Sequence, residues 1–156
     1  MNAIILWRVA HILFVAVWMG SSLSIGADAK RALAERANGG ALLIARASSA
    51  FQRSMAALIL TFGSGLGLLF EKGGFKAVER EVHMTMGITL IIILVRAALA
   101  MPSLSRVRKG VSGTDEDAAD AEGATKRLSM AIGIEHLLFL AGLFLMVYAV
   151  YKNPAA

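Results

Sequence analysis

Three histidines are the residues of this chain best suited to hold a metal or a prosthetic group. His11, His83 and His136 are the only histidines in the sequence, and each lies within a long apolar stretch. An ionisable side chain inside hydrocarbon costs several kcal/mol unless it is paired or lines a cavity. Their placement therefore favours a binding role over a merely structural one. The chain has no cysteine, which excludes thiolate ligands and disulfides.

The depths of the histidines decide which of them can share a ligand. At about 1.5 Å per residue, His11 is expected roughly 12 Å below one face of a ~30 Å hydrocarbon core and His136 roughly 12 Å above the other. Their helices run antiparallel, so the two imidazoles are expected to differ in depth by only about 6 Å, whereas His83 is expected about 9 Å beyond His11. The preferred ligand pair is therefore His11 with His136.

This pair of imidazoles favours a haem over other metal centres. Facing histidines in a helical bundle, without thiolates or clustered carboxylates, suit an axially ligated haem better than a hard cation. The sequence has no CxxCH motif, so the haem is expected to be b-type and held without covalent attachment. Trp18 follows His11 by two helical turns and could wall the macrocycle, or it could equally be an ordinary packing residue. A catalytic zinc site would need three protein ligands at one depth, and the expected depths of the three histidines argue against it.

Two arginines and a glutamate form a second group of candidates. Arg53, Arg96 and Glu135 are all expected roughly 7 to 11 Å deep, on the side of the membrane opposite His83. Glu135 is expected to pair with Arg53 or Arg96, because an unpaired carboxylate at that depth is costly. The cluster could anchor haem propionates or form part of a proton path, or each arginine could extend its side chain to the interface. Arg8, near the opposite face, could meet propionates directed that way.

The elements that position these residues are four apolar stretches long enough to cross a bilayer. They are expected as helices over about 3–26, 47–70, 82–101 and 128–151, within one membrane domain of residues 1–156. Pro102 is expected to end the third helix. Of the 156 residues, 57% are hydrophobic and 17% are charged, and the mean hydropathy is +0.66. The sequence therefore predicts an all-α integral membrane protein, a four-transmembrane-helix bundle.

Basic residues are concentrated in the predicted loops 27–46 and 102–127, and the opposite side of the membrane has fewer. By the positive-inside rule, both loops are expected in the cytoplasm and both termini in the periplasm of a bacterial inner membrane. The net charge of +5 is explained by these loops and by contact with anionic lipid. No nucleic-acid partner is therefore expected.

A pattern of residues runs through the first three spans. It comprises Trp7, His11-Ile12, Phe14-Val15, Trp18, Arg53, Met55, Ile59-Leu60-Thr61, Gly67-Leu68-Leu69 and Val82-His83. In these residues the chain resembles the bacterial membrane protoporphyrinogen oxidase family and its relatives, the copper-resistance D-domain proteins. The resemblance implies a haem-b-binding membrane bundle in which His11 is a haem ligand or catalytic residue. Thr85 stands where the oxidase family has a functionally important lysine, and Gly133-Ile134-Glu135-His136 replaces its usual Asn-Glu-x-Pro pattern.

The leading functional prediction is a haem-b-binding inner-membrane protein with a redox or electron-transfer role. Two alternatives stay open: an oxidoreductase of the protoporphyrinogen oxidase type that uses His11 with a different partner, and a copper-handling or assembly protein. In the copper alternative, His83 with Met84 and Met86 would form a soft metal site, since residues 83 and 86 share a helix face. The expected surroundings are the lipid bilayer, with a redox protein, a quinone and further copies of the chain left open as partners.

Overall fold

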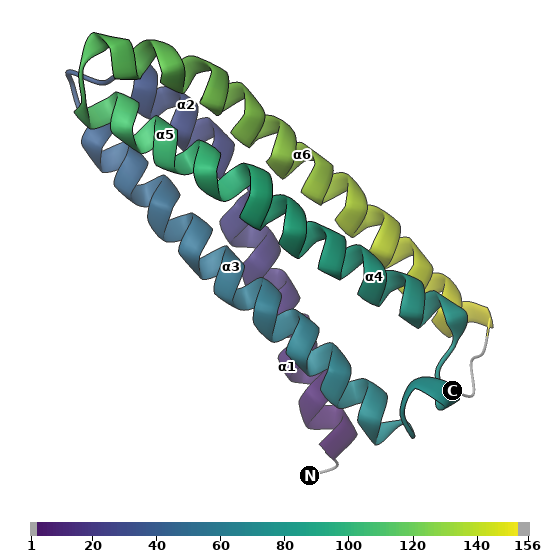
Figure 1. The fold of residues 1–156 in the computed structure, drawn as a ribbon. Coiled ribbons are helices and arrows are strands. Elements are labelled where there is room, and N and C mark those ends of the chain that lie inside the picture. Colours follow the sequence, from purple (N-terminus) through teal and green to yellow (C-terminus); the bar gives the residue numbers. More distant parts are fainter. Residues whose placement is uncertain (1–2, 153–156) are drawn as a thin grey trace.

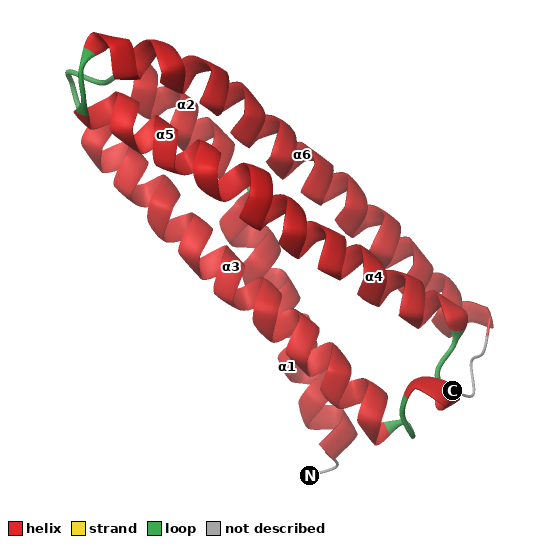
Figure 2. Ribbon diagram, in the orientation of Figure 1, coloured by secondary structure: helices red, strands yellow, loops and turns green. Residues whose placement is uncertain are grey.

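Helices account for nearly every residue from 3 to 152, the part of the chain that the computed structural model describes. Figure 2 shows them as the only regular elements of this part, joined by short turns. In chain order they are α1 (Ala3–Ser22), α2 (Ile25–Ala34), α3 (Gly40–Glu71), the short 3-10 helix η1 (Phe75–Ala77), α4 (Arg80–Val95), the π-helical turn η2 (Arg96–Ala100), α5 (Met101–Ser112) and α6 (Asp115–Lys152).

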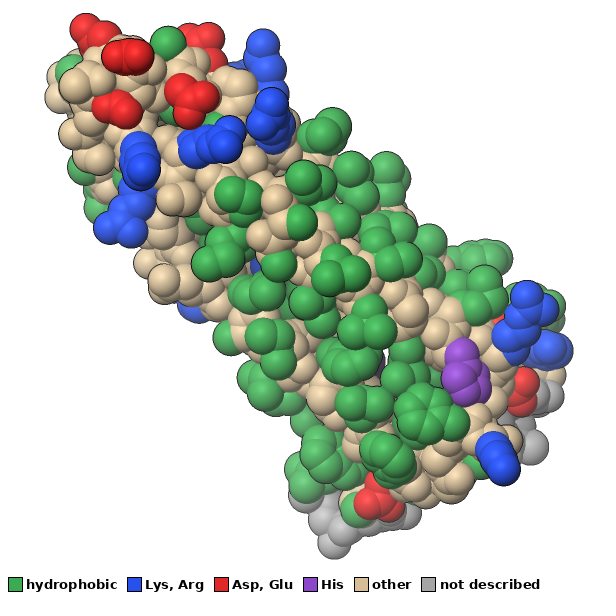
Figure 3. Space-filling model, in the orientation of Figure 1, with side chains coloured by type: hydrophobic (Ala, Val, Ile, Leu, Met, Phe, Trp, Pro, Cys, Tyr) green, Lys and Arg blue, Asp and Glu red, His purple; other side chains and the backbone are tan. Residues whose placement is uncertain are grey.

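These elements form four rods, because α1 leads almost directly into α2 and α4 continues through η2 into α5 (Figure 1). Each rod is long and apolar enough to span a membrane: Ala3–Ala34, Gly40–Glu71, Arg80–Ser112 and Asp115–Lys152. Large apolar side chains such as Ile12, Leu94 and Leu137 point outward. Figure 3 shows hydrophobic side chains over the middle of one face and charged ones gathered toward both ends. The predicted all-α bundle of four membrane-spanning helices is confirmed.

The segments predicted as loops, 27–46 and 102–127, are mostly helical and lengthen the bundle. Here α2, the start of α3, α5 and the start of α6 pack around the buried residues Ile25, Val107 and Leu128. Most of the other buried side chains are small, and Gly110 lies directly against Ala121. Close packing of small residues stabilises these helices, whereas charge content alone predicted loops. On which side of the membrane this part lies stays a prediction.

Pro102 does not end the third rod, so that prediction was wrong. It lies at the start of α5, immediately after the π-helical turn η2. In a regular helix, proline lacks a donor and its ring collides with the carbonyl four residues back. In η2 the N–H of Met101 instead donates to the carbonyl of Arg96, five residues back. This wider turn accommodates the proline, and the helix continues to Ser112.

The bundle is packed tightly at one end and divided into two helix pairs at the other. In Figure 1 the pair α1–α3 diverges from the pair α4–α6 toward the end where α1 begins and α6 finishes, which we call the terminal end. The larger buried cluster lies at the opposite, α2–α5 end. A smaller cluster of Trp18, Ala57, Leu58 and Ile92 lies between the two ends. Within the first pair, Gly67 lets the ring of Trp7 approach α3 closely.

Candidate functional site

Arg96 and Glu135 form an ion pair in the interior of the bundle. Nε of Arg96 donates to Oε2 of Glu135 and Nη2 donates to Oε1, both at 2.7 Å. Both side chains are 0% exposed. Two parallel charge-assisted bonds of this kind fix geometry as well as charge. Of the two arginines expected to pair with Glu135, the structure therefore places Arg96 against it.

Residues from the other two spans complete the shell around this pair. Ser54 on α3 accepts a hydrogen bond from Nη1 of Arg96, and Ser22 on α1 accepts one from Nη2, both at 2.6 Å. The ring of Phe51 lies 5.4 Å from the guanidinium carbon. Nε1 of Trp18 donates to Oε1 of Glu135 at 2.6 Å. We call Trp18, Ser22, Ser54, Arg96 and Glu135 the buried network; it joins all four rods.

The buried network changes the roles predicted for two of its members. Four hydrogen bonds engage four of the five N–H groups of Arg96, which leaves it little capacity to anchor a haem propionate. Trp18 is 2% exposed and is fixed by Glu135 and by an edge-on contact with Phe139, with ring centroids 5.4 Å apart. A satisfied ion pair with these contacts is suited to holding helices in register.

The other two arginines among the predicted site residues, Arg8 and Arg53, lie on the surface. Arg53 on α3 and Arg8 on α1 are both exposed, and the structure gives neither an ion pair within residues 3–152. Ser54, the next residue on α3, is buried and contacts Arg96. Arg53 projects from a different face of α3 and therefore does not reach Glu135 in the bundle interior. Arg8 stays on the same helix as His11, three residues nearer the terminal end.

His11 faces α3, where its Nδ1 lies 3.0 Å from Oγ of Ser64. The hydroxyl of Ser64 in turn donates to the carbonyl of Thr61 at 3.0 Å. A hydroxyl has one proton; while that proton is donated to Thr61, Oγ of Ser64 accepts and Nδ1 of His11 is the donor in their contact. The neutral ring then carries its lone pair on Nε2. Metal-ligating histidines commonly have this arrangement, in which one ring nitrogen binds the metal and the other donates a hydrogen bond.

His136 lies near the buried network, far from His11. It follows Glu135 directly, so its backbone is about 1.5 Å along α6 from that residue. His11 precedes Trp18 by 7 residues and Ser22 by 11, so it lies about 10 to 16 Å from these network residues toward the terminal end. The structure therefore does not bring the preferred pair, His11 and His136, together. Nε2 of His136 is buried and has no hydrogen-bond partner among the described residues.

His83 lies at nearly the depth of His11. It precedes Arg96 by 13 residues in the same rod, about 20 Å along the axis. The Arg96 side chain leans toward the start of its helix, so the distance along the axis from His83 to the Arg96 guanidinium is shorter than that. Nδ1 of His83 is 3.1 Å from the carbonyl of Glu79, which can only accept, so Nδ1 donates and Nε2 keeps the lone pair. The ring is exposed and lies beside Phe75, with centroids 6.0 Å apart.

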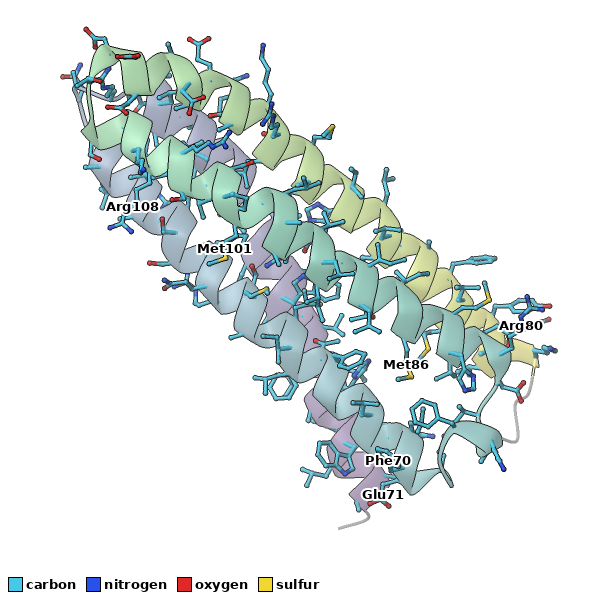
Figure 4. All side chains as sticks on the ribbon, viewed as in Figure 1. Phe70, Glu71, Arg80, Met86, Met101 and Arg108 are labelled. Atoms are coloured by element: carbon cyan, nitrogen blue, oxygen red, sulfur yellow. The ribbon has the colours of Figure 1, made fainter. Side chains whose placement is uncertain are left out.

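The methionines near His83 do not converge. Met84 lines a shallow pocket with Arg80, Phe144 and Tyr148 on the α6 side of α4. Met86 points from α4 toward α3 (Figure 4). The predicted copper ligands thus lie on two sides of one helix. Within residues 3–152, no group of three or more His, Cys, Asp or Glu side chains is arranged to hold a metal ion.

Three serines of the site were missed in the sequence. Ser22, Ser54 and Ser64 each donate a hydrogen bond to a carbonyl of their own helix, three or four residues back. This local bond lets a serine enter an apolar helix at little cost, so a lone serine gives no clear signal. Depth was the one signal that could have indicated them, because Ser22 and Ser54 lie at the depth of Arg96 and Ser64 lies at the depth of His11.

The chain matches no protein-family model, and comparisons with curated proteins and with solved structures likewise found no match.

Proposed function

We propose that this protein binds haem b between its two helix pairs near the terminal end and takes part in electron transfer. One observation carries the proposal: His11 and His83 lie at similar depth on helix pairs that diverge, each with Nε2 left for a ligand. Packed helices lie about 8 to 10 Å apart, too close to hold a macrocycle between two histidine ligands. The divergence of the pairs toward the terminal end (Figure 1) supports a wider helix spacing there.

The chain's own residues would hold and tune such a group. Ser64 and the carbonyl of Glu79 would orient the two imidazoles and leave Nε2 of each as the ligating nitrogen. Arg8, one helical turn before His11, is available for a propionate because it is exposed and has no ion pair within residues 3–152. When bound, the haem supplies a one-electron redox centre whose potential depends on these ligands and on water access.

The charge pattern supports a location for this centre. Cations are concentrated at the α2–α5 end, which favours that end in the cytoplasm of a bacterial inner membrane. The terminal end, with both histidines, would then lie near the periplasmic face. An electron partner, either a protein or a quinone, would approach there.

The oxidase and copper alternatives gain no support from the geometry. The hydroxyl of Thr85, at the position of the oxidase family's lysine, donates to the carbonyl of Glu81 at 3.0 Å and lies 3.4 Å from that of Gly142. Thr85 therefore lies in the contact between α4 and α6 and offers no base to a substrate. Met84 and Met86 point to different sides of α4, so they do not form one site with His83.

Visible spectroscopy of the purified protein tests the proposal. After expression with haem supply, we expect a reduced-minus-oxidised spectrum of haem b, abolished by His11→Ala and by His83→Ala. His136→Ala is the matched control and should retain haem. A protein that stays colourless after reconstitution with hemin would refute haem binding. Loss of haem in His136→Ala but not in His83→Ala would refute the ligand pair.

A further inference from the structure

A lateral groove of about 500 Å³ runs between α3 and the η2–α5 segment. It begins at the level of the buried network and extends toward the α2–α5 end, so it is separate from the histidine site. Arg96 and Phe51 form part of its floor. It opens sideways, where a membrane-spanning bundle meets lipid.

The lining of the groove changes from apolar to polar along its length. Toward the terminal end it is formed by Met55, Ala56, Ile59, Ala97 and Met101. Toward the α2–α5 end Leu104 also lines it, but the other side chains are polar: Ser48, Gln52, Ser105 and Arg108. Figure 4 shows Met101 and Arg108 along the side of α5 that faces α3. The groove thus has the polarity of an amphiphile, with its cation at the polar end.

The polar end offers donors that the protein itself does not use. Within residues 3–152, no hydrogen bond or ion pair engages the guanidinium of Arg108 or the side chains of Gln52 and Ser105. A guanidinium with two neighbouring neutral donors matches a phosphate group. Basic residues at a membrane surface also attract anionic lipids.

The length of the groove matches one leaflet. Ser48 and Ile59 are 11 residues apart on α3, as are Ala97 and Arg108 on the facing rod, so both walls are about 16 Å long. Half of a ~30 Å hydrocarbon core is about 15 Å. We propose that the groove binds an anionic phospholipid, with its phosphate at Arg108 and one acyl chain along Ala56, Ile59 and Met101.

Such a lipid would cover the side of the buried network that faces the membrane. Arg96 and Phe51 are already buried, and the lipid would add an apolar layer over the side of the groove where they lie. The inference does not depend on the haem proposal, because the groove and the histidines lie on different parts of the bundle.

Native mass spectrometry of the delipidated protein in detergent tests the inference, with phosphatidylglycerol and phosphatidylcholine of identical chains as probes. We expect one phosphatidylglycerol to bind at least fivefold more tightly than phosphatidylcholine. Arg108→Gln should abolish that preference, and Ala56→Phe should weaken both lipids by filling the apolar part. Arg106→Gln removes an exposed cation from the same helix outside the groove and should bind like the unchanged protein.

Two results would overturn the inference. One is equal affinity for the two lipids, which would show that no phosphate site exists at Arg108. The other is an equal loss in Arg106→Gln and Arg108→Gln, which would show that net charge alone attracts the lipid. Circular dichroism of each variant establishes that its helices are intact before binding is compared.

Discussion

Breaking the Arg96–Glu135 pair from one side should destabilise the protein severely. Glu135→Gln keeps the size of the side chain and an acceptor for Trp18, but it leaves the charge of Arg96 uncompensated in a fully buried position. Removing one partner of a buried pair costs about 3 to 5 kcal/mol. Arg96→Met leaves the carboxylate uncompensated in the same way, so a similar loss is expected. If the two effects were independent, together they would cost roughly 6 to 10 kcal/mol.

The double variant Arg96→Met with Glu135→Gln should cost much less than that sum. Both charges are then gone, the amide still accepts from Trp18, and the hydroxyls of Ser22 and Ser54 keep bonds to their own helices. We expect a loss of about 1 to 3 kcal/mol, hence a coupling energy of roughly 3 kcal/mol or more between the two positions. Reversible unfolding in mixed micelles, with a rising mole fraction of SDS and helicity as the signal, measures all four free energies.

Arg53→Met is the matched control, because Arg53 lies in the same depth range but is exposed and has no ion pair within residues 3–152. Its free energy of unfolding should change by less than about 0.5 kcal/mol. A loss in Glu135→Gln no larger than that in Arg53→Met would contradict a costly uncompensated charge at Arg96. Single losses that simply add in the double variant would show that the two side chains are not coupled.

Three further predictions concern other parts of the chain. Gly110→Ala should destabilise the α2–α5 end by about 1 to 3 kcal/mol, because a Cβ there would collide with Ala121. Gly123→Ala should instead stabilise α6 by about 0.5 to 1 kcal/mol, because a Cβ at that position meets nothing within 4 Å. The same unfolding assay compares the two variants. At the start of α6, hydrogen bonds from the backbone N–H and hydroxyl of Thr114 hold the pKa of Asp117 below its ordinary value. The stabilisation from this cap is therefore complete above the ordinary aspartate pKa of about 3.9 and is lost as pH falls through the lower pKa of the folded state. Amide exchange in the first turn of α6 should accelerate in acid, and Asp117→Asn should remove that pH dependence. Ser64→Ala should lower haem affinity 10- to 100-fold in a hemin titration while leaving His11 in place, because it removes the partner of Nδ1.

Hydropathy was sufficient to predict the spans, since a stretch of apolar residues of membrane length has few other stable arrangements in water or lipid. It was not sufficient to predict what lies beyond them. Residues 27–46 and 102–127 carry enough charge to resemble loops, yet their alanines and glycines fall on the faces where α2, α5 and α6 meet. That coincidence is a property of four segments together, and no single segment displays it. The π-helical turn before Pro102 was likewise not predicted, because a proline inside an apolar stretch normally indicates the end of a helix.

The depths of the polar residues were easier to predict than their partners. Arg53 and Arg96 occupy similar depths, but only Arg96 faces Glu135, because rotation about the helix axis decides partnership. The histidines show a second limit. Their depths were counted from expected helix ends, whereas the contacts of Ser22 and Trp18 with Glu135 fix the register of α1 against α6 and place His136 far from His11. An error of two turns in register, about 11 Å, is enough to exchange one ligand pair for another.

The buried network and the histidine pair are therefore parts of one arrangement. Four hydrogen bonds on Arg96 hold α1, α3, η2 and α6 at a single level. Beyond that level the two helix pairs diverge, so the register of α1 against α4 depends on these bonds together with the packing of Trp18 and of α2. A slip of one helical turn, about 5.4 Å, would separate His11 from the depth of His83. The ion pair would contribute nothing to haem ligation itself, but it helps to fix the register and so to determine which residues lie at one depth at the terminal end of the bundle.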